Sequence, residues 1–295
     1  MLLASLTSVA SLAPAPGARF FYYLLDHGRR APISIEKNSK TTDWLVLMPG
    51  SGCSFAEIGD SHFLKWLMAK RDYNVILIGK TGADLGKDED ACRVDEFQHS
   101  SVRSQRILDN QTIMHDLIPA NARILLAAIS EGAYIAPDVA LADERVKAYI
   151  DLSGNSKSWM VEELMFVPEG PARDKLANFF NNEVRGHNSF TQYYVDWTYA
   201  YLNSYDTHRT YDVFKQLQIP IIWLNGDHDD TVWADGARQD AAELIDNEGK
   251  SNISYHWLAG GNHGLKCADS APSCIEEKLD AQVEKLITDF ASDYF

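Results

Sequence analysis

This sequence has few positive charges and lacks the cysteine and histidine spacings of metal sites. The first shortage argues against a nucleic-acid-binding protein and the second against a metalloprotein. The chain has 27 Lys and Arg residues against 42 Asp and Glu residues, a net charge of −15, and no Lys/Arg cluster. Such a chain repels the backbone of nucleic acids, so we expect no nucleic-acid partner. Cys-x-x-Cys and His-x-x-x-His spacings are also absent, so we expect no metal site, and no cofactor is implied.

The remaining composition is that of an ordinary globular protein. Hydrophobic residues make up 45% of the 295 positions and charged residues 23%. A chain of this length can bury a large core, and α/β folds of this size are often a single domain. No internal repeat or low-complexity segment occurs.

The first 17 residues are apolar and rich in small side chains. They resemble the hydrophobic part of a secretory signal, but they lack a positive start, and Pro14 follows the best cleavage position, Ala13. Two interpretations stay open: a signal peptide, or an N-terminal arm that lies on the body. The segment is too short to span a membrane.

The four cysteines are even in number and unevenly spaced. Cys267 and Cys274 enclose a short loop with Pro and Ser, which predicts a local disulfide, and Cys53 would then pair with Cys92. The sequence alone leaves three connectivities open. Together with the N-terminal segment, this pattern favours an oxidising compartment, periplasmic or secreted, with the cytoplasm as the alternative.

One serine stands where a buried strand turns into a helix. Residues 124–129 form a continuous apolar run, typical of a strand buried on both faces, and Ser130 follows it directly. A serine at such a corner has a strained backbone and a protruding hydroxyl. Small residues must flank it, and Ala128 and Gly132 do. The alternative is an ordinary strand followed by a serine helix cap.

Two further segments supply the partners of a serine nucleophile. Residues 219–224 predict a buried strand followed by a turn that contains Asp229. Residues 253–264 predict another strand, which Gly260 and Gly261 break, with His263 in the loop beyond. The carboxyl ends of parallel strands share one edge of a sheet, where ligands bind. Each turn alone can arise from loop preferences. All three together, in this order, favour catalysis.

These segments resemble those of the α/β-hydrolase family, and the resemblance covers nearly the whole chain. The nucleophile elbow of the family matches residues 128–132, with Ala in place of the first Gly. The acid motif Gly-x-x-Asp-x-x-Val matches residues 226–232 and selects Asp229 over its rivals Asp227 and Asp230.

The resemblance also implies roles for the remaining catalytic groups. The histidine loop, Gly-x-His-Gly, matches residues 261–264 and gives His263 as the base for Ser130, with Asp229 as the orienting acid. The expected product of the first step is an acyl-enzyme that water hydrolyses.

The oxyanion hole departs from the family pattern. The loop after the third strand usually starts His-Gly, whereas residues 49–53 read Pro-Gly-Ser-Gly-Cys. We expect the backbone N–H of Glu131 as one donor and that of Ser51, or else Gly52, as the other. The side chain of Glu131 has two interpretations: it anchors the elbow, or it is an exposed glutamate at a helix start.

The expected fold is a mostly parallel central sheet of about eight strands flanked by helices, with a helical cap inserted after the sixth strand. The core would comprise residues 18–154 and 216–295, and the cap residues 155–215. The cap segment is rich in aromatic residues, and in the family this position walls the acyl pocket. We expect Trp159 and Trp233 to bind substrate.

The chain also predicts the individual elements. Strands are expected at residues 19–25, 31–36, 43–48, 73–78, 124–129, 146–152 and 219–224, and from residue 253 up to the break at Gly260. Helices are expected at residues 62–70, 102–117 and 273–295, and an irregular loop at residues 79–100.

The function that the resemblance implies is hydrolysis of carboxylic esters, with a small acyl compound as substrate. A peptidase or amidase with the same triad is the alternative, for which Glu162 and Glu163 give only a hint of an amine-binding cluster. A binding protein that has lost catalysis is a third reading, against which the three catalytic residues argue. The sequence leaves the oligomeric state open.

Overall fold

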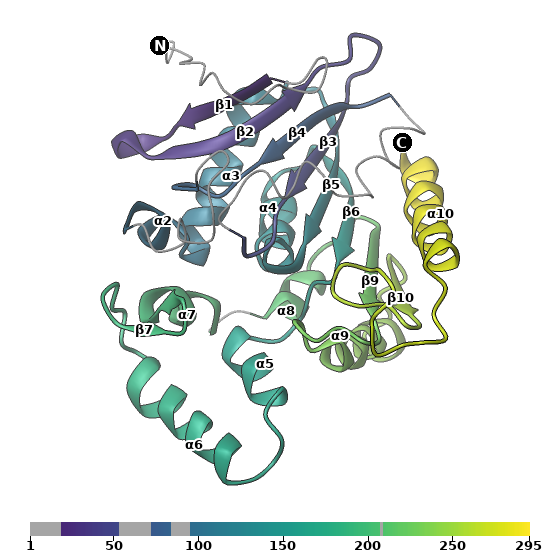
Figure 1. Ribbon diagram of the computed structural model, residues 1–295. Helices are drawn as coiled ribbons and strands as arrows, with labels where there is room; N and C mark the ends of the chain where they lie inside the picture. Colours follow the sequence, from purple (N-terminus) through teal and green to yellow (C-terminus); the bar gives the residue numbers. More distant parts are fainter. Residues whose placement is uncertain (1–18, 53–71, 84–94, 207–208) are drawn as a thin grey trace.

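The computed structural model describes residues 19–52, 72–83, 95–206 and 209–295. At the centre of this part of the chain lies an eight-stranded sheet (Figure 1). Its strands are β1 (Arg19–Leu24), β2 (Arg30–Glu36), β3 (Asp43–Met48), β4 (Asn74–Ile78), β5 (Arg123–Ile129), β6 (Val146–Leu152), β9 (Ile221–Gly226) and β10 (Ile253–Leu258). They are arranged in the order β1-β2-β4-β3-β5-β6-β9-β10.

Most of this sheet is parallel. The strands β1 and β2 form the predicted hairpin around the short 3₁₀ helix η1 (Asp26–Gly28), and β2 is antiparallel to β4; all other neighbours are parallel. All residues of β3 and β4 are buried, as expected for strands covered on both faces. The carboxyl ends of β3, β5, β6, β9 and β10 therefore meet at one edge.

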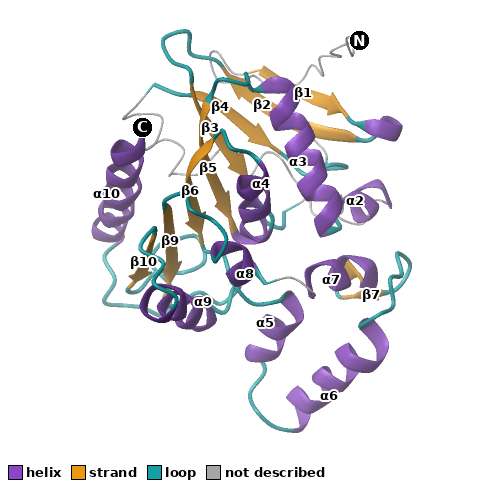
Figure 2. Cartoon of the chain, turned by 180° about the vertical axis from the view of Figure 1, so that it is seen from behind, coloured by secondary structure: helices purple, strands orange, loops and turns teal. Residues whose placement is uncertain are grey.

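Helices cover both faces of the sheet (Figure 2). On one face α3 (Arg103–Leu117), α4 (Ala136–Ala142) and α9 (Ala234–Ala242) pack with Val46 and Leu126; on the other, α10 (Glu276–Tyr294) packs with Leu45 and Leu125. Successive strand residues point to opposite faces, so each strand feeds two separate cores.

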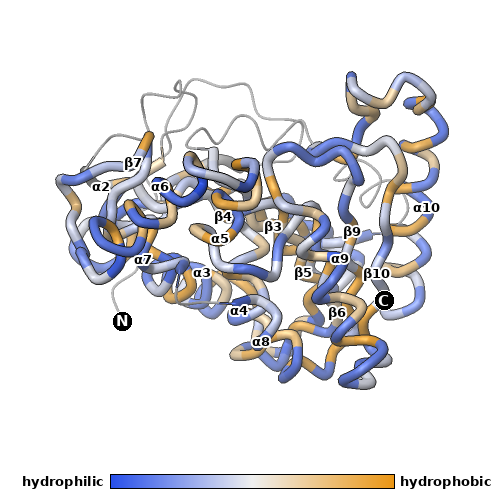
Figure 3. Tube along the Cα trace, turned by 90° about the horizontal axis from the view of Figure 1, so that it is seen from below, coloured by the Kyte–Doolittle hydropathy of each residue, from blue (hydrophilic) through white to orange (hydrophobic). Residues whose placement is uncertain are grey.

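The last helix shows the pattern that the sequence predicts. Along α10 hydrophilic and hydrophobic residues alternate (Figure 3). Its buried side chains recur every three or four residues: Leu279, Val283, Ile287, Phe290 and Ala291. This spacing places one helix face on the sheet. No helix in the described ranges combines the length and apolarity needed to cross a membrane.

The chain between β6 and β9 lies beyond the edge at which the parallel strands end (Figure 1). It contains α5 (Trp159–Met165), α6 (Pro171–Phe179), the π-helix η5 (Phe180–Val184), the short strands β7 (Tyr193–Tyr194) and β8 (Trp197–Thr198), α7 (Tyr199–Asp206) and α8 (Thr210–Phe214). The strands β7 and β8 form a separate antiparallel pair, so this segment is not purely helical.

The expected elements and the observed ones differ in a few places. The end of the expected loop at residues 79–100 is helix α2 (Asp95–Ser100), whose Phe97 is fully buried beside Ala83 and Trp197. A helix of six residues shows too little periodicity to be predicted. The helix expected at residues 62–70 and the N-terminal segment 1–17 lie outside the described residues.

Candidate active site

Ser130 occupies the corner that the sequence predicts. It follows β5, opens the 3₁₀ helix η4 (Ser130–Tyr134), has a positive φ of 53°, and is 9% exposed. A Cβ on Gly132 would lie 2.5 Å from the carbonyl oxygen of Met48, so only glycine lets the elbow pack against the end of β3. A Cβ on Gly50 would lie 3.1 Å from the Cβ of Ser130. The loop after β3 therefore adjoins the serine.

Asp229 lies in the turn after β9, and its side chain is fully buried. Its Oδ1 accepts hydrogen bonds of 2.9 Å from the backbone N–H groups of Thr231 and Val232. The Nδ1 atom of His263 lies 2.9 Å from Oδ2 and 3.1 Å from Oδ1. The carboxylate is thus fixed by the backbone and faces the imidazole, which is the geometry that orients a catalytic histidine.

The two rival aspartates have other surroundings. Asp227 Oδ1 accepts a hydrogen bond of 2.6 Å from the backbone N–H of Gly260, and it lies 3.9 Å from Nε2 of His228. Asp230 is exposed and accepts a hydrogen bond from the Thr231 hydroxyl. Of the three acids, Asp229 is the one whose hydrogen bonds reach His263.

The histidine loop is attached beside the elbow. The hydroxyl of Ser153, the residue after β6, donates to the carbonyl oxygen of His263 at 2.7 Å. Because Ile129 pairs with Leu152 in the sheet, Ser130 and Ser153 follow neighbouring strands that lie about 5 Å apart. Among the hydrogen bonds of the described residues, none joins Ser130 to His263. In enzymes without substrate this bond is often long.

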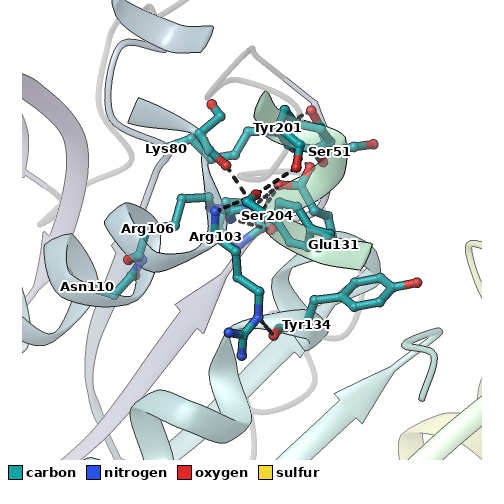
Figure 4. A network of polar contacts seen from close by, with 12 residues as sticks. Ser51, Lys80, Arg103, Arg106, Asn110, Glu131, Tyr134, Tyr201 and Ser204 are labelled. Atoms are coloured by element: carbon teal, nitrogen blue, oxygen red, sulfur yellow. Dashed lines mark hydrogen bonds and ion pairs between the residues drawn. The ribbon is translucent and has the colours of Figure 1, made fainter. Parts of the chain in front are cut away.

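Glu131, the residue after the serine, is buried rather than exposed. Only 4% of it is exposed, so the interpretation as a surface glutamate is wrong. Its carboxylate pairs with Lys80 at 3.2 Å and with Arg106, and it accepts a hydrogen bond of 3.0 Å from the Tyr205 hydroxyl (Figure 4). Burial opposes the charge of Glu131, but the two cations hold its pKa below the usual value.

Lys80 and Arg106 also reach the loop after β3, which contains the expected oxyanion donors Ser51 and Gly52. Lys80 Nζ donates to the carbonyl oxygen of Ser51 at 2.6 Å, and Arg106 Nη2 donates to that of Pro49 at 3.2 Å. Both cations are buried, and burial lowers the pKa of Lys80 to about 8. Sequence reasoning missed both residues, because nothing local to either one signals burial.

The two expected substrate-binding tryptophans lie in different surroundings. Trp159 opens α5 and meets the rings of Trp197 and Tyr201 edge to face at 6.3 and 6.2 Å. Trp233 is half-buried ahead of α9, where its ring covers Gly236 so closely that a Cβ there would lie 2.4 Å away. Trp159 thus belongs to an aromatic cluster, and Trp233 packs on its own helix.

The acidic pair in α5 does not form an open cluster. Glu162 is 3% exposed and accepts a hydrogen bond from the Tyr134 hydroxyl. Burial raises the pKa of Glu162 well above its usual value. Glu163 is half-buried, and burial also raises its pKa.

The two cysteines in the described part of the chain are joined to each other. Cys267 and Cys274 form the predicted disulfide, with 5.6 Å between their Cα atoms. The pairing of Cys53 with Cys92 lies outside the described residues. Within the described ranges, no three His, Cys, Asp or Glu side chains gather in a way that could hold a metal ion.

The strand order, the crossover connections and the position of the elbow are those of the α/β-hydrolase fold, which this chain adopts. No family model matches the sequence, and no curated protein does. Similar solved structures show the fold at low sequence identity.

Three of them illustrate the likeness. An acylaminoacyl peptidase from Pyrococcus horikoshii has a TM-score of 0.61 and 16% identity over 94% of this chain, which spans 42% of the peptidase. Est1E from Butyrivibrio proteoclasticus, bound to ferulic acid, has a TM-score of 0.56 and 13% identity over 90% of this chain and 99% of its own. An esterase domain from Rhodothermus marinus has a TM-score of 0.57 and 14% identity over 94% and 98%.

Proposed function

We propose that this protein is a serine hydrolase that cleaves carboxylic esters, with Ser130, His263 and Asp229 as its triad. The observation that carries the proposal is the buried carboxylate of Asp229, which faces Nδ1 of His263 at 2.9 Å in a loop tied to the strand beside the elbow. The strained, nearly buried Ser130 at the carboxyl end of β5 supplies the nucleophile. The fold alone would not name a function.

The reaction follows from these positions. His263 Nε2 takes the proton of the Ser130 hydroxyl while Oγ attacks the acyl carbon, and Asp229 stabilises the imidazolium that forms. The oxyanion of the tetrahedral intermediate accepts hydrogen bonds from the backbone N–H of Glu131 and that of Ser51 or Gly52. His263 then protonates the leaving alcohol. Water, deprotonated by His263, attacks the acyl-enzyme; the tetrahedral intermediate then collapses, the acid is released, and His263 returns the proton to Oγ of Ser130.

We assign the substrate pocket to the cap. In this assignment residues 18–154 and 216–295 form the core, and residues 155–215 cover the edge that carries Ser130. Trp159 and Trp233 are the proposed substrate contacts. The aromatic rings of the cap favour a small apolar or aromatic acyl group. The ferulic acid bound by the similar Est1E supports a small-molecule substrate.

A peptidase or amidase with the same triad is the second candidate. The similarity to an acylaminoacyl peptidase favours it. The burial of Glu162 against Tyr134 counts against it, because this carboxyl is already engaged in a hydrogen bond and is shielded from an amine substrate. A binding protein without catalysis is the least favoured reading, because such a protein would have no need for a buried carboxylate that faces the histidine at 2.9 Å.

Turnover of graded substrates decides among these functions. We expect the purified protein to hydrolyse nitrophenyl esters, with a preference among acyl chain lengths, and to leave aminoacyl anilides largely intact. The Ser130→Ala variant should lose the ester activity. Anilide turnover above ester turnover would favour the peptidase, and no turnover of either class would contradict the proposal.

The compartment is a further part of the proposal. The disulfide between Cys267 and Cys274 favours an oxidising environment, so we place the protein in the periplasm or outside the cell, with the cytoplasm as the alternative. In this assignment residues 1–17 are a signal peptide or an N-terminal arm.

A further inference from the structure

A cluster of three buried charges stands behind the proposed oxyanion hole. The side chains of Lys80, Arg106 and Glu131 are each at most 4% exposed. Two cations and one carboxylate give the cluster a formal charge of +1. Buried ion pairs seldom add net stability, because desolvation offsets their attraction. The cluster therefore calls for a role other than holding the fold together.

The cluster connects the loop at residues 49–52 with the elbow. Lys80 donates to the carbonyl oxygen of Ser51, and Arg106 donates to that of Pro49. Both cations pair with Glu131, the residue next to the nucleophile. Figure 4 shows these side chains converging: Lys80 from the loop after β4, Arg106 from α3 and Glu131 from η4.

The two carbonyl contacts set the direction of two N–H groups. The described chain has no cis peptide bond, and in a trans peptide the C=O and the N–H point in opposite directions. Holding the carbonyl of Pro49 fixes the N–H of Gly50, and holding that of Ser51 fixes the N–H of Gly52. This loop adjoins Ser130, as the 3.1 Å approach from Gly50 shows.

Glu131 connects the two halves of the oxyanion hole. Its own backbone N–H is the first proposed donor, and its side chain holds the cations that hold the loop carrying the second. Preorganised donors of this kind stabilise the transition state because they need not reorient during the reaction. The net positive charge of the cluster also stabilises the negative charge that develops on the oxyanion, because opposite charges attract.

We propose that Lys80 and Arg106, themselves held by Glu131, are positioning residues that keep residues 49–52 in the geometry of the oxyanion hole. This inference rests on the proposed hydrolase function and adds to it. It assigns a role to three charged side chains that touch neither the acyl carbon nor the leaving group.

The surroundings of Lys80 make this role dependent on pH. Its ammonium faces Glu131 and Arg106, lies 4.7 Å from the ring centre of Phe97 and 5.5 Å from that of Trp197, and shares Glu131 with Tyr205. Burial lowers the pKa of Lys80 to about 8, while that of Tyr205 is raised, so Tyr205 stays neutral. Above about pH 8 the charge of Lys80 is lost, which removes its ion pair with Glu131 and weakens its hydrogen bond to Ser51.

The test separates transition-state binding from ground-state binding. A trifluoromethyl ketone forms a tetrahedral adduct with the serine and places an oxyanion in the hole, whereas the matching methyl ketone binds without this adduct. For Lys80→Met we expect kcat for a nitrophenyl ester to fall on the order of 10²-fold, as when one oxyanion donor is lost. The Ki of the trifluoromethyl ketone should rise by a similar factor, while KM and the Ki of the methyl ketone stay close to those of the wild type.

Two further variants complete the test: one is a control for loss of folded protein, and the other tests the pH dependence. Arg145→Met removes a mostly buried cation far from the site, which pairs with Asp143, and it should leave the ratio of the two inhibition constants unchanged. Glu131→Gln keeps the backbone N–H but removes the charge that raises the pKa of Lys80. It should therefore move the alkaline loss of activity to lower pH. Endpoint titration with a fluorophosphonate counts the folded sites in each variant.

The outcomes are distinct. Inhibition constants that change equally for both ketones in Lys80→Met, or an unshifted alkaline limb in Glu131→Gln, would overturn the positioning role. Failure of the hydrolase function itself would be visible in the wild type, which would then bind the trifluoromethyl ketone no more tightly than the methyl ketone. That result removes the inference along with the function.

Discussion

At the scale of single residues, the choice among three neighbouring aspartates determines the proposed chemistry. Asp227, Asp229 and Asp230 follow the same strand, and the sequence motif favours the middle one. In the structure the carboxylate of Asp229 accepts two backbone hydrogen bonds and faces His263. The backbone of the turn therefore holds the carboxylate of Asp229 in place.

Substitution of these acids tests the assignment. In Asp229→Asn the amide oxygen can still accept from Thr231 and Val232, but the amide N–H₂ faces Nδ1 and favours the wrong imidazole tautomer. We expect kcat to fall by about 10⁴-fold, as measured by steady-state ester hydrolysis. Asp227→Asn keeps its contact with Gly260 and should stay close to the wild type. Equal losses in the two variants would refute the assignment.

Asp151 gives a second prediction at this scale. It is fully buried in β6, where its Oδ2 accepts from the Tyr149 hydroxyl and its Oδ1 from the backbone N–H of Gly154, each at about 3 Å. Burial raises its pKa to about 7, from an ordinary value of about 3.9. Between these values the folded protein holds a proton that the unfolded chain has released, so this group contributes stability that is lost as the pH rises to about 7.

The Asp151→Asn variant resembles the neutral acid and lacks this titration. We expect the free energy of unfolding of the wild type, measured relative to that of the variant, to decrease between about pH 4 and pH 7 and to level off above. Urea unfolding at several pH values measures it. Asp246→Asn, at an exposed position, should show no such trend, and a flat difference for Asp151→Asn would contradict the account.

At the scale of secondary structure, the elbow depends on how closely η4 approaches the end of β3. A Cβ at position 132 would lie 2.5 Å from the carbonyl oxygen of Met48 and 2.7 Å from that of Pro49. The elements cannot both keep their places around a larger residue, so the loop that carries the proposed oxyanion donors must move.

Gly132→Ala is therefore expected to cost both stability and activity. Overpacking of this kind lowers the free energy of unfolding by about 1–3 kcal/mol, and kcat should fall on the order of 10²-fold through the displaced donor. Gly249→Ala is the control. Its φ of 66° strains alanine, but the site is open, so this variant should lose stability and keep its kcat. Full activity of Gly132→Ala in folded protein would show that the close approach is not needed.

The elements also show what the sequence could and could not predict. The bounds of β3 and β6 match the prediction because both segments are mostly apolar and lie between polar or turn residues. Ser130, Asp229 and His263 are identified from strand–turn patterns. The burial of Glu131 could not be predicted, because its partners Lys80 and Arg106 are 51 and 25 positions away in the sequence. A charged residue can be buried only with its partners, and pairing across the fold leaves no local pattern.

At the scale of the whole molecule, the segment between β6 and β9 is joined to the core at the elbow. The helix α7 contributes Tyr205, which donates to Glu131, and Ser204, whose hydroxyl accepts from the backbone N–H of Arg103 at 3.0 Å. The wall of the proposed pocket and the proposed oxyanion hole therefore share one polar network.

The disulfide is the second feature that acts on the whole fold. It closes a loop between Cys267 and Cys274, which packs on Gly260 at the start of the histidine loop. Replacing both cysteines by alanine should lower the free energy of unfolding by about 2–3 kcal/mol, as expected for a loop of this length. Thermal unfolding followed by circular dichroism would show a lower Tm, and an unchanged Tm would contradict this estimate.

The central claim is that Ser130 is an activated nucleophile, and covalent labelling tests it most directly. After incubation with a fluorophosphonate, intact-mass measurement should show one adduct per chain, and peptide mapping should locate it on Ser130. The adduct should be absent from Ser130→Ala and should form far more slowly in Asp229→Asn. An unlabelled wild type, or an adduct that persists in Ser130→Ala, would contradict the account.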